Sequence, residues 1–216
     1  MRGPHNIWRL IRTGATFERT GAMGVVLDAF DAPPHLRLAA RVLGWPFKWL
    51  GLRGDVNTPP ATRALTALGP AYIKFGQILS TRPDVVGDEL AEQLKVLQDK
   101  LPPFSIEVAK QSIARELGDD TDNIFSDFNP ALAAASIAQV HKATLRENGE
   151  QVAVKVLRPG IERAFQKDLD AFFLAAWIIE MLSPSSRRLR PMDVITHFES
   201  VVLGELDLRL ESSAAS

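Results

Sequence analysis

Residues 133–158 decide the fold, and they read AAASIAQVHKATLRENGEQVAVKVLR. Within them, Gln151–Leu157 is rich in valine and is typical of a β-strand. Asn148-Gly149 separates this strand from a second one at Val140–Leu145. That dipeptide predicts a β-hairpin with a type I′ turn, because both central residues of such a turn tolerate positive φ. The sequence therefore predicts a small antiparallel sheet between about Ile124 and Arg158.

Helical patterns flank this sheet on both sides. The expected helices cover residues 58–80 with a break at Gly69-Pro70, then 87–98, 105–117, 161–182 and 191–213. Proline is favoured at the first position of a helix, so the break at Gly69-Pro70 predicts the start of a new one. The order of helices, small antiparallel sheet and helices predicts an α+β fold.

Composition excludes several classes of protein. The 216 residues contain no cysteine, which excludes disulfides, thiolate zinc sites and a cysteine nucleophile. The four histidines are scattered, so we expect no metal site. The net charge of −1 gives no basic field for nucleic acid, which we do not expect as a partner. We also expect neither a membrane span nor a secretion signal, because no apolar stretch reaches about 20 residues.

Charge is divided unevenly along the chain. Residues 1–53 carry a net charge of +5 and the remainder carries −6. Trp8, Trp45 and Trp49 lie among the basic residues of this first part. Cations beside aromatic side chains suit a surface that lies on anionic lipid. The alternative is that the tryptophans pack between helices and the cations are only solvated.

The eight residues Ala133–Val140, called here the alanine-rich loop, follow the spacing of a protein-kinase glycine-rich loop. Small residues occupy the three glycine positions of that template, and valine occupies the eighth. A Cβ at the glycine positions restricts how closely backbone amides approach a phosphate. We therefore expect a nucleotide to sit differently here than in an ordinary kinase.

Lys155 ends the segment Val152-Ala153-Val154-Lys155, fifteen residues after Val140. This segment matches the third strand of kinases, whose lysine reaches the α- and β-phosphates of ATP. Taken alone, the loop could be core packing and the lysine a residue at a sheet edge. Together, in this order and at this spacing, they predict ATP binding. The residues expected to bind ATP are Ala133, Ala134, Ala135, Ser136, Ile137, Ala138, Val140 and Lys155.

The segment Ala71–Ser80 predicts an amphipathic helix with a polar pair. Lys74 and Gln77 are three residues apart and therefore neighbours on the helix surface. Gly76 lies between them and permits close approach of another backbone or of a ligand.

The last helix carries Glu205, Asp207 and Glu211 near its end. At about 100° per residue, Asp207 and Glu211 share a face and Glu205 lies well round from both. The acids could therefore serve two different cations, or they could be ordinary solvated charges.

These motifs resemble the UbiB/AarF/ADCK family of atypical, protein-kinase-like proteins, a group associated with ubiquinone biosynthesis. Four segments match the family's pattern in its order, over roughly residues 65–211. They are Lys-x-Gly-Gln at 74–77, the alanine-rich loop at 133–136, the strand-three lysine at 155 and Glu-x-Asp at 205–207. The resemblance implies a protein-kinase-like small lobe, made of a short antiparallel sheet and an αC-type helix, with an N-terminal helical extension. The sequence departs from the family in that we expect the large lobe to be missing.

The resemblance also implies roles for the polar residues. The helix that carries Lys74 and Gln77 is expected to fold over the nucleotide site and to block the groove for a peptide substrate. ATP hydrolysis is then expected more than protein phosphorylation. Our hypothesis is that Glu211 orients Lys155, while Glu205 or Asp207 pairs with Lys74. The residues expected to be catalytic are Lys155, Glu211, Lys74, Gln77, Glu205 and Asp207.

No residues before Ser216 match a catalytic-loop Asp with its downstream Asn or an Asp-Phe-Gly motif. We therefore expect an N-terminal portion of the family, in three parts: 1–57, basic and helical; 58–120, a helical extension; and 121–216, the small lobe. Mg²⁺ would be held by residues that this sequence lacks, and we expect no phosphoryl transfer by these residues alone.

The functional expectation is an ATP-binding, kinase- or ATPase-like protein that supports ubiquinone biosynthesis. Its expected partners are ATP, a membrane surface, and quinone-precursor lipids or biosynthesis proteins. The expected location is cytoplasmic and peripheral to a membrane, the inner membrane if the source is bacterial. The alternative is a non-catalytic module that binds lipid or a partner and keeps the kinase-like sheet only as scaffold.

Overall fold

The computed structural model describes residues 4–30, 32–97, 102–182 and 190–207. It divides into two units, residues 1–98 with 163–216 and residues 99–162, and each is described by itself. The mixture of many helices with one three-stranded antiparallel sheet confirms the predicted α+β class. The division into three segments stays a prediction.

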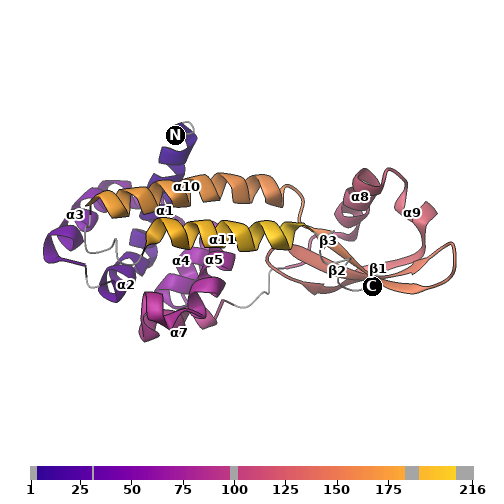
Figure 1. Ribbon diagram of the computed structural model, residues 1–216, viewed down its shortest axis with the longest axis horizontal. Helices are drawn as coiled ribbons and strands as arrows, with labels where there is room; N and C mark the ends of the chain where they lie inside the picture. The colour runs from indigo at the N-terminus through magenta and orange to yellow at the C-terminus, as the bar shows by residue number, and fades with distance from the viewer. Residues whose placement is uncertain (1–3, 31, 98–101, 183–189, 208–216) are drawn as a thin grey trace. The chain divides into compact units, whose positions relative to one another are not determined.

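The first unit is helical (Figure 1). Its elements are α1 (Pro4–Thr20), α2 (Ala22–Ala29), α3 (Pro34–Gly44), η1 (Trp45–Leu50), α4 (Pro60–Leu68), α5 (Pro70–Ser80), α6 (Pro83–Val86), α7 (Asp88–Lys95), most of α10 (Ile161–Leu182), and α11 (Pro191–Leu206). Several of them begin with proline, whose fixed φ suits the first helical turn. The predicted break at Gly69-Pro70 is confirmed, because α4 ends at Leu68 and α5 begins at Pro70.

Aromatic rings form the centre of this unit, where α5, α10 and α11 meet. The Phe75 ring lies 5.1 Å from the rings of both Phe172 and Phe198. Phe172 and Phe198 join α10 to α11 at 5.8 Å, and these two helices run side by side (Figure 1). Tyr72 meets Phe172 edge to face at 4.6 Å. Such ring pairs add stabilisation beyond the apolar area that they bury.

Helix α1 is fastened to the same centre by polar contacts. Arg9 forms an ion pair with Asp168 of α10, and Thr13 Oγ1 lies 2.7 Å from Tyr72 Oη of α5. Burial raises the pKa of Tyr72 to about 12, although the hydrogen bond to Thr13 acts in the opposite direction. Burial likewise raises the pKa of Asp168, and this effect outweighs that of Arg9.

The second unit contains the predicted sheet, in the order β1–β2–β3. The strands are β1 (Phe125–Ala134), β2 (Ala138–Leu145) and β3 (Gln151–Leu157), and α8 (Ile106–Leu117) and α9 (Thr121–Ile124) precede them. The β2–β3 hairpin is confirmed, but the type I′ turn is wrong. Of the two central residues, only Gly149 has positive φ, at 73°. The last pair of the ladder is Thr144 with Gln151, so the turn is longer than two residues.

The two faces of the sheet differ. On one face, Ala109 and Ile113 of α8 pack against Phe125, Ala143 and Val156. Side chains alternate between faces along a strand, so Val140, Lys142 and Lys155 lie on the face away from α8. This second face is called the open face below.

Helix α11 ends earlier than the predicted 191–213. It ends at Leu206, and Asp207 follows with φ −86° and ψ 85°, outside the helical region. The assumption that Asp207 and Glu211 share a helical face is therefore wrong for Asp207. The other expected helices, 87–98, 105–117 and 161–182, correspond to α7, α8 and α10.

Candidate functional site

The alanine-rich loop joins β1 to β2 in the second unit. The ladder between these strands ends with Ala134 opposite Gln139. Ala135 N then donates to Ala138 O at 2.8 Å, which closes a tight turn. Ser136, Ile137 and Ala138 are buried. The loop is therefore held against its own sheet.

Lys155 lies beside this loop. It pairs across the ladder with Val140, the last residue of the loop, so both side chains lie on the open face. Lys155 is half-buried. The second unit therefore brings together the loop and the strand-three lysine, which are the two groups expected to bind the phosphates of ATP.

A hydrogen-bonded network that no sequence motif indicates lies on the face covered by α8. Gln139 Oε1 accepts from Phe104 N at 3.0 Å, and Gln139 Nε2 lies 2.8 Å from His141 Nε2. Since the amide nitrogen donates, His141 Nε2 accepts, and its Nδ1 donates to Asn129 O at 2.8 Å. His141 is fully buried. The pair could have been predicted from the alternation of side chains along β2, because this alternation places Gln139 and His141 on the same face of the sheet.

The Lys-x-Gly-Gln segment lies on α5 in the first unit. Lys74 Nζ is 2.5 Å from Glu205 Oε1 of α11. Of the two acids expected as partners of Lys74, Glu205 is therefore the one that the structure places there. The side chains are 17% and 35% exposed, so the pair is partly shielded from water. The ion pair joins α5 to the C-terminal end of α11.

The other two residues of the segment serve the packing of α5. Gln77 Nε2 donates to Leu97 O at 3.2 Å. A Cβ on Gly76 would approach the side chains of Leu65 and Leu97 closer than 3.0 Å. The close approach that this glycine permits is therefore to two leucine side chains.

The expected pairings of Asp207, Glu211 and Lys155 are not tested by the described part of the chain. Glu211 lies outside the described residues, so its expected contact with Lys155 is untested. Asp207 follows the end of α11, and Lys74 and Lys155 belong to different units.

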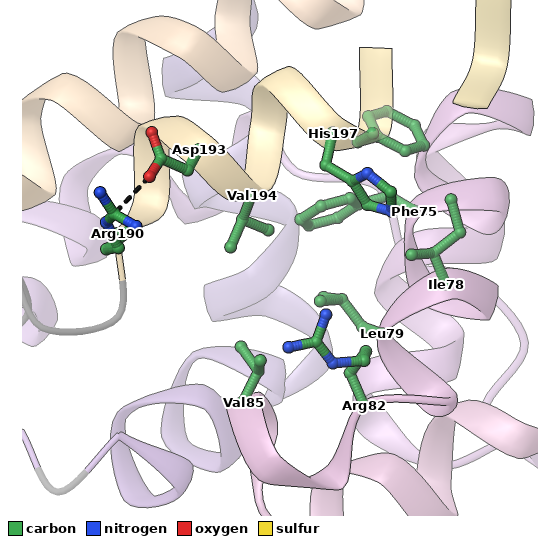
Figure 2. Close-up of a pocket in the computed structure, with 10 residues that line it drawn as sticks. Phe75, Ile78, Leu79, Arg82, Val85, Arg190, Asp193, Val194 and His197 are labelled. Carbon is green, nitrogen blue, oxygen red and sulfur yellow. Dashed lines mark ion pairs between the residues drawn. The ribbon is translucent and has the colours of Figure 1, made fainter. Parts of the chain in front are cut away.

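A pocket of about 250 Å³ opens in the first unit beside α5, α6 and α11 (Figure 2). Its wall is mainly apolar, and Phe75, Leu79 and Val194 contribute to it. Arg82, Arg190, Asp193 and His197 supply its polar groups, and Arg190 pairs with Asp193 at 2.9 Å. The pocket therefore combines an apolar wall with several charged or polar side chains.

An exposed apolar stripe lies on α3 and η1. Leu38, Val42 and Trp45 follow one another at helical spacing, and each has at least 60% of its surface exposed. Trp49 is 73% exposed, so neither Trp45 nor Trp49 packs between helices of the described part. Arg41 and Lys48 are exposed beside them. Among the described residues, no helix is long and apolar enough to cross a bilayer.

A three-stranded antiparallel sheet, a small-residue loop and a lysine on the third strand define a protein-kinase-like small lobe, here with a helical extension. Residues 96–216 match the family model of the ABC1 atypical kinase-like domain. The chain belongs to this family of atypical kinase-like proteins.

Curated relatives match nearly the whole chain. A probable protein kinase UbiB of Shewanella baltica (strain OS185) is 42% identical over an alignment 216 residues long, which covers 98% of this chain and 37% of the relative. The proteins of the same name from Shewanella sp. (strain MR-4) and Pseudomonas paraeruginosa (strain PA7) are 49% and 41% identical, over 98% and 96% of this chain and 37% and 39% of the relatives. The chain therefore spans less than two fifths of the length of these relatives.

Proposed function

We propose that this chain supplies the nucleotide-binding small lobe of an atypical kinase- or ATPase-like protein that supports ubiquinone biosynthesis. The observation that carries the proposal is the pairing of Lys155 with Val140 on the open face, directly beside the alanine-rich loop. The ubiquinone part rests on the name of the UbiB relatives.

The residues present fit a nucleoside triphosphate. The ammonium of Lys155 supplies positive charge for the phosphates, and the loop supplies backbone at the end of the same sheet. The face that carries Lys155 is the one that α8 leaves uncovered. The alanine side chains then limit how deeply the phosphates enter the loop.

Thermal stabilisation by Mg²⁺-ATP tests this proposal, in the protein expressed at the full length of its open reading frame. A ligand that binds only the folded state stabilises it by about 2.7 kcal/mol at a concentration of 100 times its Kd. We expect a raised Tm for the wild type and little rise for Lys155→Ala.

Lys142→Ala is the matched control, because Lys142 is an exposed lysine on the same face of the sheet. It should respond to ATP as the wild type does. An equal Tm with and without ATP in the wild type would remove the nucleotide proposal.

We also propose that the stripe on α3 and η1 contacts an anionic membrane. Exposed tryptophans beside Arg41 and Lys48 match the chemistry of a lipid headgroup region, where aromatic rings insert and cations meet phosphate. The apolar pocket beside α5 and α11 gives a lipid a second place to bind in the same unit.

Sedimentation with lipid vesicles tests the membrane proposal. The wild type should co-sediment with phosphatidylglycerol vesicles and less with phosphatidylcholine vesicles. The double change Trp45→Ser and Trp49→Ser should abolish this, whereas Trp177→Ser, at an exposed tryptophan on α10, should not. Equal binding by the double variant and the wild type would contradict the proposal.

The same pocket and stripe also support the alternative, which is a non-catalytic module that binds lipid or a partner. It predicts vesicle binding without any effect of ATP. Ubiquinone content separates the two readings: in a strain that lacks its own UbiB relative, the full-length protein should restore ubiquinone, and Lys155→Ala should not. Restoration by Lys155→Ala would favour the non-catalytic module.

These 216 residues alone are expected to bind nucleotide at best, because they contain no match to the catalytic-loop or metal-binding motifs of kinases. Release of phosphate from ATP over many turnovers by the purified 216-residue chain would contradict this expectation.

A further inference from the structure

Arg158 directly follows β3 and reaches the alanine-rich loop. Its backbone N donates to Ile137 O at 2.9 Å. Its guanidinium donates to Ala135 O from both Nε, at 3.2 Å, and Nη2, at 3.1 Å. One residue thus holds two carbonyl groups of the turn between β1 and β2.

The same guanidinium also holds the segment that leads into α8. Nη2 donates to Pro102 O at 3.0 Å, and the guanidinium carbon lies 5.7 Å from the centre of the Phe104 ring. Burial lowers the pKa of Arg158, so these contacts replace hydration that the side chain has lost. Arginine suits this place because its planar fork donates in several directions at once.

Arg158 and Lys155 lie on opposite faces of the sheet. Val156 belongs to the core covered by α8, and Phe104 packs against that core. Arg158 lies two residues beyond Val156 and stacks on Phe104, so it reaches the loop from the covered side. Lys155 lies on the open face, where ATP is proposed to bind.

We propose that Arg158 is a positioning residue for the nucleotide site. It fixes the backbone of the alanine-rich loop from the face covered by α8, while Lys155 contacts the nucleotide on the open face. This inference rests on the proposed function. A loop with alanine in place of glycine offers fewer ways to wrap a phosphate, so a fixed backbone geometry matters more for its affinity.

The test measures the Kd of Mg²⁺-ATP by calorimetry at low and high salt, in the full-length protein. Arg158→Gln removes the fork and the charge, and Arg158→Lys keeps the charge without the fork. Both should weaken binding about tenfold, the loss expected for one hydrogen bond from a charged group. The salt dependence of binding should stay that of the wild type, because Arg158 does not contact the phosphates.

Arg146→Gln is the matched control. Arg146 lies at the far end of the same sheet and has the same kind of contacts: its backbone N donates to Ile124 O, and its guanidinium donates to Asp122 O and Phe125 O. Its loss should leave the Kd unchanged. Hydrogen exchange should speed up at the amides of Ala135 and Arg158 in the two Arg158 variants only.

Three results would overturn the inference. If the Arg158 variants bind ATP like the wild type, Arg158 does not position the loop, and the proposed function stands. If Arg158→Gln weakens binding while Arg158→Lys keeps full affinity, or if Arg158→Gln flattens the salt dependence, the charge of Arg158 acts on the phosphates directly and the positioning role is wrong. If the wild type itself binds no ATP, the proposed function fails and the inference fails with it. Arg158→Lys keeps the aliphatic stem and decides the matter should Arg158→Gln not fold.

Discussion

At the scale of residues, the ion pair between Lys74 and Glu205 joins the Lys-x-Gly-Gln motif to the Glu-x-Asp motif in the first unit. Exposed pairs contribute little to stability, whereas removing one partner of a shielded pair leaves a poorly hydrated charge. This pair is intermediate in exposure, so the stability of the unit should depend on it measurably.

We predict that Lys74→Glu or Glu205→Lys alone lowers the free energy of unfolding by about 1–2 kcal/mol, and that the two changes together restore at least half of the loss. Urea unfolding measures this. Glu92→Gln, which breaks the more exposed pair with Lys95, should leave the free energy of unfolding nearly unchanged. Additive losses in the double variant would contradict the pairing.

Tyr72 gives a second prediction, on pH. It is the only tyrosine in the chain, so tyrosinate absorbance reports on it alone. Burial raises its pKa from 10.0 to about 12. The folded state therefore holds this proton more tightly, and the resulting stability is complete below pH 10 and is lost as the pH rises towards 12.

Titration of the folded protein should give a tyrosinate midpoint near 12, and titration in denaturant should give one near 10. Tyr72→Phe should remove this part of the pH dependence of the unfolding free energy. It should also cost about 1 kcal/mol at neutral pH, through loss of the hydrogen bond with Thr13. A folded-state midpoint near 10 would show that the phenol is solvated.

At the scale of elements, close packing of α5 against its neighbours depends on Gly76. We predict that Gly76→Ala destabilises the chain by about 1–2 kcal/mol, because a Cβ meets Leu65 and Leu97. Gly14→Ala in α1 is the control, since its Cβ would meet nothing within 4 Å and alanine is the better helix former.

The Tm of both variants in thermal unfolding tests this prediction. Gly14→Ala should raise the Tm, and Gly76→Ala should lower it. In a Leu97→Ala background the cost of Gly76→Ala should shrink, because the side chain in its way is gone. A Tm increase for Gly76→Ala would show that α5 does not approach its neighbours closely.

Elements with local signals could be predicted from the sequence. Gly69-Pro70, Asn148-Gly149 and the valine-rich strand each act through neighbouring residues, and the structure has the break, the hairpin and the strand. The turn type was wrong because Asn148 does not take positive φ, and nothing local to the dipeptide decides how far the ladder extends.

Contacts between distant residues were harder to predict. Lys74 had two candidate acids, and the helical argument assumed a helix that continues beyond Leu206. Arg158 was overlooked because its partners are backbone carbonyl groups, which leave no mark in a sequence. The position of Arg158 at the loop follows only from the register of β2 with β3, which places Ala138 opposite Leu157.

At the scale of the whole molecule, the two units carry different chemistry. The helical unit holds the Lys74–Glu205 pair, the apolar pocket and the tryptophan stripe. The sheet unit holds the alanine-rich loop, Lys155 and Arg158. We propose that the first unit contacts lipid and the second binds nucleotide, so substitutions in one unit should remove one property without loss of the other.

Hydrogen exchange with and without Mg²⁺-ATP shows where along the chain the nucleotide binds. If the alanine-rich loop and Lys155 bind ATP, exchange becomes slower with ATP in residues 133–140 and 151–158 of the wild-type full-length protein, and no such change occurs in Lys155→Ala. Unchanged exchange in both segments, or slowing confined to the helical unit, would contradict this placement of the nucleotide.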